Sequence, residues 1–332
     1  MSNEQSGIMD DEDVQSSETT QQGNEPDKSN EQGEQEAFQA LIELALAQDR
    51  LGNYQEMLEA AEQASEYDPA SAMALACKAR ALQKLERLSE ATIANDQALL
   101  LDTNLSLAWI NRSGLQVLQE RFPEALRSAN RAIELNPNDA RAWANKGMAL
   151  FNLNNLLDAL AAMNQSLHCD PDFLFALQMK GEILRRYGRI HELVQTMQHA
   201  LQIAPEDIIS LSLMVQALRV LEEYEQLPPY TSKLVQLTPD SPFAWDSHMR
   251  VLRANSRFEE ANDAIDHMVE LLPDDARQWA IKADNLYRLE RYREATQVAE
   301  HALRLSPGYP PAQRIHEKAV RLMYQRKPKR RI

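Results

Sequence analysis

The spacing of prolines restricts the fold of this chain more than any other feature. Seven of the 15 prolines lie on one grid with an interval of 34 residues, and Thr103 occupies its single gap. The grid prolines are Pro69, Pro137, Pro171, Pro205, Pro239, Pro273 and Pro307. Because proline lacks a backbone N–H and interrupts helices, the grid predicts a series of equal units with one boundary at the same place in each.

Two further residue types keep the same interval. All four tryptophans lie 28 residues before a grid proline: Trp109, Trp143, Trp245 and Trp279. A third series consists of Ala91, Ala125, Ala159, Ala261 and Ala295, with Met57, Leu193 and Leu227 in the remaining units. Three residue types in one register indicate tandem structural repeats.

Each unit contains two sets of apolar or small residues with helical spacing. Counted from residue 38, the first set falls at positions 4, 7, 8 and 11 of the unit, and the second falls at positions 20, 24 and 27. Both spacings place their members on one face of a helix. The chain is 44% apolar and has only 9 glycines. Each unit therefore predicts a pair of helices whose apolar faces are covered by neighbouring pairs.

The 34-residue unit resembles the tetratricopeptide repeat. The motifs that carry the resemblance are Ala-Trp-Ala-Asn-Lys-Gly-Met-Ala-Leu (142–150), Tyr-Arg-Glu-Ala (292–295) and Phe-Pro-Glu-Ala (122–125). The resemblance implies an all-α fold, a right-handed superhelical solenoid of helix-turn-helix repeats with a C-terminal capping helix. Eight units of 34 residues account for 272 of the 332 residues.

The register predicts eight repeats within residues 37–309. The repeats are 38–71, 72–105, 106–139, 140–173, 174–207, 208–241, 242–275 and 276–309. A capping helix is expected over 310–325, because Ala312, Ile315, Ala319, Leu322 and Met323 share one helical face.

The sixth repeat departs from the pattern. Pro228 and Pro229 lie where its second helix should be starting, near Tyr224. Two missing backbone donors should delay or shorten that helix. We expect a local distortion between the sixth and seventh repeats, which makes this joint a candidate hinge.

Both ends of the chain are strongly charged tails. Residues 1–36 hold eleven acidic side chains and one basic one, and we expect them to be disordered. They are either a solubilising tail or, through the acidic run 10–13, a segment that folds back onto the solenoid and competes with partners. The basic tail 326–332 is either a nuclear address signal or a solvated end.

The sequence offers no catalytic or metal-binding motif. His191 and Glu192 begin a zinc-protease pattern, but Gln195 stands where the second histidine ligand is needed. Cys77 and Cys169 are isolated, as reduced thiols in the cytosol usually are. With a net charge of −15 and no long apolar run, we expect a cytoplasmic protein without enzymatic activity, cofactor, nucleic-acid partner or membrane insertion.

The resemblance implies that the first helices line a concave groove, with side chains at positions 2, 5, 6, 9, 12 and 13 facing a partner. Position 6 holds Asn111 and Asn145, whose amides suit a peptide backbone. Arginines gather at the other groove positions: Arg141, Arg185, Arg186, Arg219, Arg250, Arg253 and Arg288. Arginine suits carboxylates, although acidic residues on nearby helical turns are alternative partners for these side chains.

The function predicted from these features is a protein-interaction scaffold or adaptor that binds an extended, acidic peptide segment in its groove. Two alternatives remain at this point. One is an assembly or chaperone-type factor that wraps a partner through broad contacts. The other is a regulatory subunit that recruits substrates to an enzyme.

Overall fold

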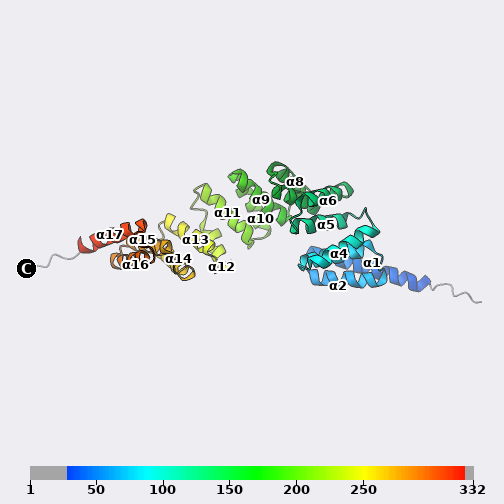
Figure 1. Ribbon diagram of the computed structural model, residues 1–332, viewed down its shortest axis with the longest axis horizontal. Coiled ribbons are helices and arrows are strands. Elements are labelled where there is room, and N and C mark those ends of the chain that lie inside the picture. The colour runs from blue at the N-terminus through cyan, green and yellow to red at the C-terminus, as the bar shows by residue number, and fades with distance from the viewer. Residues whose placement is uncertain (1–27, 326–332) are drawn as a thin grey trace, which may run out of the picture.

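The computed structural model describes residues 28–325, which contain seventeen α-helices and no strand. The helices alternate between two series along an elongated, arched molecule (Figure 1). The first helices of the successive pairs are α1 (Lys28–Leu51), α3 (Ala72–Lys84), α5 (Ser106–Leu118), α7 (Ala140–Asn152), α9 (Leu174–Tyr187), α11 (Ile208–Val220), α13 (Pro242–Ala254), α15 (Ala276–Arg288) and α17 (Pro310–Gln325).

Each second helix packs against the first helix of its own pair. The second helices are α2 (Tyr54–Tyr67), α4 (Leu88–Leu101), α6 (Phe122–Leu135), α8 (Leu156–Cys169), α10 (Ile190–Ile203), α12 (Pro228–Leu237), α14 (Phe258–Leu271) and α16 (Tyr292–Leu305). From α3 onward, each first helix begins 34 residues after the previous one. The chain therefore has an all-α superhelical repeat fold, as the residue spacing predicted for the helix pairs and the resemblance implied for the superhelix.

A hydrogen bond joins the tryptophan and proline registers. The Nε1–H of Trp143 donates to the carbonyl of Pro137 at 2.8 Å, six residues earlier. The same bond links Trp109 to Thr103, Trp245 to Pro239 and Trp279 to Pro273. Each indole therefore holds the turn that precedes its own helix, which explains why the two residue types recur in step.

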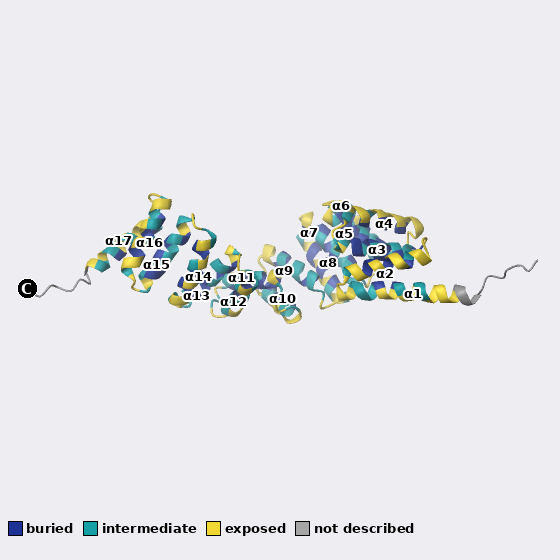
Figure 2. Cartoon of the chain, turned by 90° about the horizontal axis from the view of Figure 1, so that it is seen from below, coloured by how far each residue is buried: buried dark blue, intermediate teal, exposed yellow. Residues whose placement is uncertain are grey.

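Small residues let the two helices of a pair approach closely. The eight residues at position 20, among them Ala159 and Leu193, are completely buried. In α7, a Cβ added at Gly147 would lie only 2.7 Å from the Cε of Met163 in α8. Buried residues accordingly follow the seam between the two helix series, while the outer faces are exposed (Figure 2).

The stacking of first helices is interrupted near the proline pair. First helices pack directly on one another from α1 to α11 and again between α15 and α17, but α11, α13 and α15 hardly touch. Helix α12 begins at Pro228, four residues later than the register requires, and is only 10 residues long. The predicted delay and shortening of this helix is confirmed. The stack of first helices is interrupted near it, between α11 and α13 and again between α13 and α15.

The N-terminal boundary of the expected tail is wrong. We expected disorder throughout 1–36, but residues 28–36 form the first turns of α1, which project beyond the neighbouring helices (Figures 1 and 2). The glutamates and glutamines of this stretch are good helix formers, and α1 is anchored by its packed C-terminal half. The acidic run 10–13 and the basic tail 326–332 lie outside the described residues.

At the C-terminal end, α17 occupies the place of the expected capping helix. It packs on both α15 and α16, and Ala312 and Ala319 are completely buried there. Among the helices of residues 28–325, none is sufficiently long and apolar to cross a bilayer.

Candidate functional site

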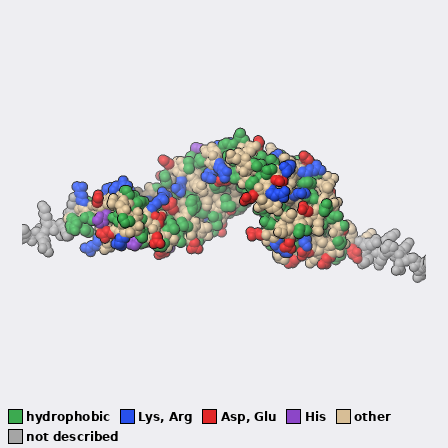
Figure 3. Space-filling view, viewed as in Figure 1, with side chains coloured by type: hydrophobic (Ala, Val, Ile, Leu, Met, Phe, Trp, Pro, Cys, Tyr) green, Lys and Arg blue, Asp and Glu red, His purple; other side chains and the backbone are tan. Residues whose placement is uncertain are grey.

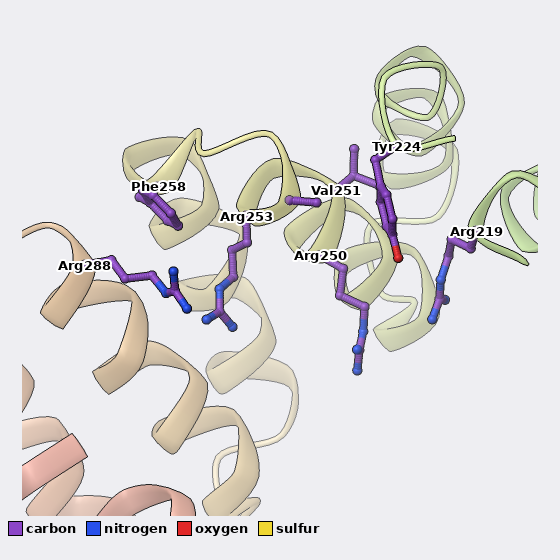
Figure 4. A pocket seen from close by; sticks show the side chains of 8 residues that line it. Arg219, Tyr224, Arg250, Val251, Arg253, Phe258 and Arg288 are labelled. Carbon is purple, nitrogen blue, oxygen red and sulfur yellow. The ribbon is translucent and has the colours of Figure 1, made fainter. Parts of the chain in front are cut away.

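A cavity of about 330 Å³ opens where α11, α13 and α15 separate, and four arginines line it (Figure 4). We call it the arginine pocket. Its lining residues are Arg219, Tyr224, Arg250, Val251, Arg253, Ala254, Phe258 and Arg288. All four of its arginines were predicted as groove residues, and the structure brings them together from three successive first helices.

Two carboxylates accompany these four guanidinium groups. Asp284 accepts hydrogen bonds from both Arg253 and Arg288, the latter at 3.0 Å. Asp246 accepts a hydrogen bond of 2.6 Å from Arg250. Within residues 28–325 the guanidinium of Arg219 has no acidic partner. Four positive and two negative charges leave a net charge of +2.

The arginine pocket is partly removed from water. Only 21% of the Arg253 side chain is exposed, and its burial lowers the pKa of that guanidinium from its usual value, against the opposing effect of Asp284. An arginine pKa starts so high that the group stays charged near neutral pH. Because charges interact more strongly where water is excluded, an anion bound here would gain more than on an open surface.

Two aromatic residues form walls of the arginine pocket, and sequence reasoning missed both as site residues. Phe258 begins α14, and the guanidinium of Arg288 lies 5.5 Å from the centre of its ring. Tyr224 occupies the equivalent register position, but it lies in the turn before α12 because the proline pair displaces that helix. Both stand at position 17 of the register, so reading that position beside the groove positions would have found them.

Two further predicted groove arginines, both on α9, lie outside the arginine pocket. Arg185 donates two hydrogen bonds, of 2.8 and 2.7 Å, to the carboxylate of Glu182 one turn earlier. Arg186 shares the same carboxylate and lies 4.0 Å from the centre of the Phe151 ring. Arg185 thus takes the alternative that its sequence context left open, an ion pair on its own helix.

A second, larger cavity lies in the N-terminal half. It measures about 1200 Å³ and is lined mainly by the first helices from α1 to α9, together with Tyr54 of α2, Leu88 of α4 and Cys169 of α8. Its lining mixes aromatic and apolar side chains such as Tyr54, Met148 and Phe173 with polar ones such as Lys84. We call it the N-terminal cavity.

An ion-pair network spans the N-terminal cavity. Asp49 of α1 accepts hydrogen bonds from Arg80 of α3 at 3.2 Å and from Arg141 of α7 at 3.0 Å. Arg141 also binds Asp139 through two guanidinium nitrogens, at 3.1 and 2.8 Å. Burial alone would raise the pKa of Asp139, but hydrogen bonds and charge from Arg141 hold it below its usual value. Asp49 and Arg141 are 92 residues apart in the chain, so the network links α1 directly to α7 across the N-terminal cavity.

The two predicted groove asparagines differ in burial, although the amide of each donates to a carbonyl 35 residues earlier. Asn111 is only 1% exposed, and its Nδ2 donates to the carbonyl of Ala76 in α3 at 2.8 Å. The prediction that Asn111 lines the groove is therefore wrong, because close helix packing turns its amide into the interface between first helices. Asn145 is half-buried and faces the N-terminal cavity, where its Nδ2 donates to the Ser113 hydroxyl at 2.8 Å.

Thiols and metal ligands add no further candidate in the part of the chain that the structure describes. Cys77 and Cys169 are free, and burial raises the pKa of the Cys77 thiol to about 12. From residue 28 to residue 325, no three His, Cys, Asp or Glu side chains are grouped to bind a metal ion.

Comparison with known proteins identifies the repeat. Tetratricopeptide-repeat models match residues 38–71 and 116–172. None of the curated proteins matches the chain in sequence. The chain therefore contains tetratricopeptide repeats in these two segments, and its 34-residue helix pairs continue the same unit outside them.

Three solved structures share the fold. A structure described as the functional characterization of Pseudomonas aeruginosa pilF is 24% identical, with a TM-score of 0.55, and the match covers 64% of this chain and 97% of that one. YrrB, described as a TPR protein with an unusual peptide-binding site, is 21% identical, with a TM-score of 0.53 and coverages of 57% and 97%. The APC/C hetero-tetramer Cut9-Hcn1 is 13% identical, with a TM-score of 0.51, and the match covers 80% of this chain and 52% of that one. At these identities the likeness shows the fold alone.

Proposed function

We propose that this chain is an adaptor that holds an extended, acidic segment of a partner protein along its concave side, with the arginine pocket as the anchor. Eight repeats within residues 37–309 form the scaffold, and α17 caps its C-terminal end. The fold is that of a protein-interaction scaffold, and the description of YrrB as a protein with a peptide-binding site supports a peptide as the partner's form.

The observation that carries the proposal is the surplus of positive charge in the arginine pocket. Four guanidinium groups face two carboxylates in a chain whose net charge is −15. A cluster of like charges is costly unless something compensates it, and a carboxylate-bearing peptide does so with bidentate hydrogen bonds.

The N-terminal half is a poorer place for an acidic segment. There Asp49 and Asp139 together already neutralise Arg80 and Arg141. Acidic side chains also gather over the α1–α2 block (Figure 3), where Glu56, Glu59, Glu62 and Glu66 of α2 are all exposed. Like-charge repulsion would direct an acidic peptide toward the α11–α15 region.

The test is a titration of an acidic peptide against the full chain. Changing the four arginines of the arginine pocket to glutamine should weaken binding by at least about tenfold, ~1.4 kcal/mol. A matched control changes four exposed arginines that precede second helices and alters the net charge equally: Arg87, Arg121, Arg189 and Arg291.

The proposal also predicts that rising salt weakens binding, because the site remains partly exposed to screening ions. Equal losses in the arginine-pocket variant and in the control would mean that only overall charge matters. An affinity unchanged between low and high salt would also contradict an electrostatic anchor.

A further inference from the structure

The donor groups at one end of the arginine pocket are incompletely used. The structure records no hydrogen bond within residues 28–325 for the guanidinium of Arg219 or for the hydroxyl of Tyr224. Arg250, their neighbour, donates through Nε to Asp246, which leaves its terminal nitrogens available. In Figure 4 these three side chains point in the same direction, with the tyrosine hydroxyl between the two guanidinium groups.

The other end of the arginine pocket is already occupied. Arg253 and Arg288 turn toward each other because both bind Asp284 (Figure 4). This pair contributes a net positive charge, but both of its guanidinium groups already donate a hydrogen bond to Asp284. An incoming anion therefore finds its open donors at Arg219, Tyr224 and Arg250, and additional attraction from the far end.

We propose that Arg219, the Tyr224 hydroxyl and Arg250 form a site for a phosphoryl dianion, carried on a phosphorylated side chain of the partner peptide. The inference rests on the proposed function and makes its anchor specific. A phosphoryl group has three acceptor oxygens and a charge of about −1.5 to −2 at pH 7. That charge matches the +2 of the pocket, and the oxygens match donors from three separate side chains.

A carboxylate fits this end of the arginine pocket less well. It carries one charge and a flat pair of oxygens, which a single guanidinium satisfies. Neutralising the arginine pocket would take two carboxylates, and bringing both into about 330 Å³ would add their mutual repulsion. One tetrahedral phosphoryl group delivers the same charge at a single centre.

The site also depends on the distortion in the sixth helix pair. If α12 began in register, Tyr224 would be its first residue rather than part of the preceding turn. At the equivalent place in the next pair, Phe258 does begin its helix and has no hydroxyl. The proline pair and the tyrosine therefore act together to place a hydroxyl donor between two arginines.

Three synthetic peptides test the inference on the full chain. They share one acidic sequence and differ at a single position, which is serine, glutamate or phosphoserine. At fixed ionic strength and pH 7.5, the phosphoserine peptide should bind about tenfold more tightly than the glutamate peptide. Equal affinities for these two peptides would overturn the inference while leaving the proposed function intact.

Single substitutions test which side chains produce the preference for the phosphoserine peptide over the glutamate peptide. Arg219→Gln and Tyr224→Phe should each reduce the ratio of phosphoserine to glutamate affinity several-fold. Arg185→Gln is the matched control, because Arg185 holds the same register position one repeat earlier and binds Glu182 outside the arginine pocket. If Arg219→Gln weakens both peptides by the same factor, the site does not distinguish a phosphoryl group.

A pH series on the unmodified chain needs no variant. The second pKa of a phosphate ester is about 6, so the preference for phosphoserine over glutamate should shrink as the pH falls from 7.5 to 5.5. A preference that stays constant over this range would exclude the dianion. Failure of all three peptides to bind at any pH would overturn the proposed function together with this inference.

Discussion

The N-terminal cavity and the arginine pocket are built from equivalent parts of equivalent helices, yet their charges are arranged in opposite ways. Around the N-terminal cavity, first helices stack without interruption, and Asp49 ties α1 to α3 and α7. Around the arginine pocket, α11, α13 and α15 separate, and arginines outnumber carboxylates. The same register position holds Asp49 in the first repeat and Arg219 and Arg253 in the sixth and seventh. The same register position can thus carry an ion pair that links helices in one half of the chain and an arginine that lines an open, positively charged pocket in the other.

The largest effect on stability is expected for Asp49→Asn. The Asp49 side chain is only 11% exposed, and its loss leaves Arg80 and Arg141 without their shared carboxylate. Removing one member of a partly buried ion pair should lower the free energy of unfolding by about 2 kcal/mol. Chemical denaturation measures the loss, and small-angle scattering should show a longer molecule.

The matched variant in the other half is Asp284→Asn. Asp284 is 25% exposed, so its removal should cost less stability than the removal of Asp49. Equal losses in the two variants would break the contrast between a structural network and a binding site.

The same Asp284→Asn change should strengthen binding of an acidic peptide. Arg253 and Arg288 would lose their internal partner, and the net charge of the arginine pocket would rise from +2 to +3. We expect about a threefold to tenfold gain in affinity, up to ~1.4 kcal/mol. Asp49→Asn serves as the comparison, since it should leave that affinity unchanged, and a titration of both variants decides.

Replacing Pro228 and Pro229 with alanine should make the C-terminal half more similar in structure to the N-terminal half. With the backbone donors restored, α12 can begin near Tyr224, about four residues earlier. Circular dichroism should show slightly more helix, and acidic-peptide affinity should fall about threefold as Tyr224 leaves the arginine pocket. More helix together with an unchanged affinity would show that the distortion does not shape the site.

The smallest expected effect is a pH dependence at the joint between α12 and α13. Burial, together with the charge of Arg257, lowers the pKa of His248, whose Nδ1 lies 3.0 Å from the Thr231 hydroxyl. The unfolded chain then takes up a proton more readily than the folded one, so stability should fall as the pH drops below about 6.5. Subtracting the profile of His248→Gln isolates this contribution, and identical profiles would show that His248 contributes nothing.

The repeat architecture could be predicted because each unit repeats the same contacts. An indole bonded to a carbonyl six residues earlier, as in Trp143 and Pro137, leaves a periodic trace in the sequence. The delayed start of α12 was equally predictable, because the effect of Pro228 is local.

Contacts between different repeats could not be read from the sequence in this way. The burial of Asn111 depends on how closely α5 approaches α3, and the bond between Asp49 and Arg141 depends on the curvature accumulated over three repeats. Neither follows from spacing alone. The different surroundings of Arg185 and Arg219 could have been foreseen, because the residue three positions earlier is Glu182 in one case and Gln216 in the other.

Hydrogen–deuterium exchange with and without an acidic phosphopeptide tests most directly where this chain holds its partner. We expect slower exchange in the C-terminal turns of α11, α13 and α15 and in the turn that contains Tyr224, with α1 to α7 unchanged. Protection confined to α1, α3, α5 and α7 around the N-terminal cavity would contradict this expectation.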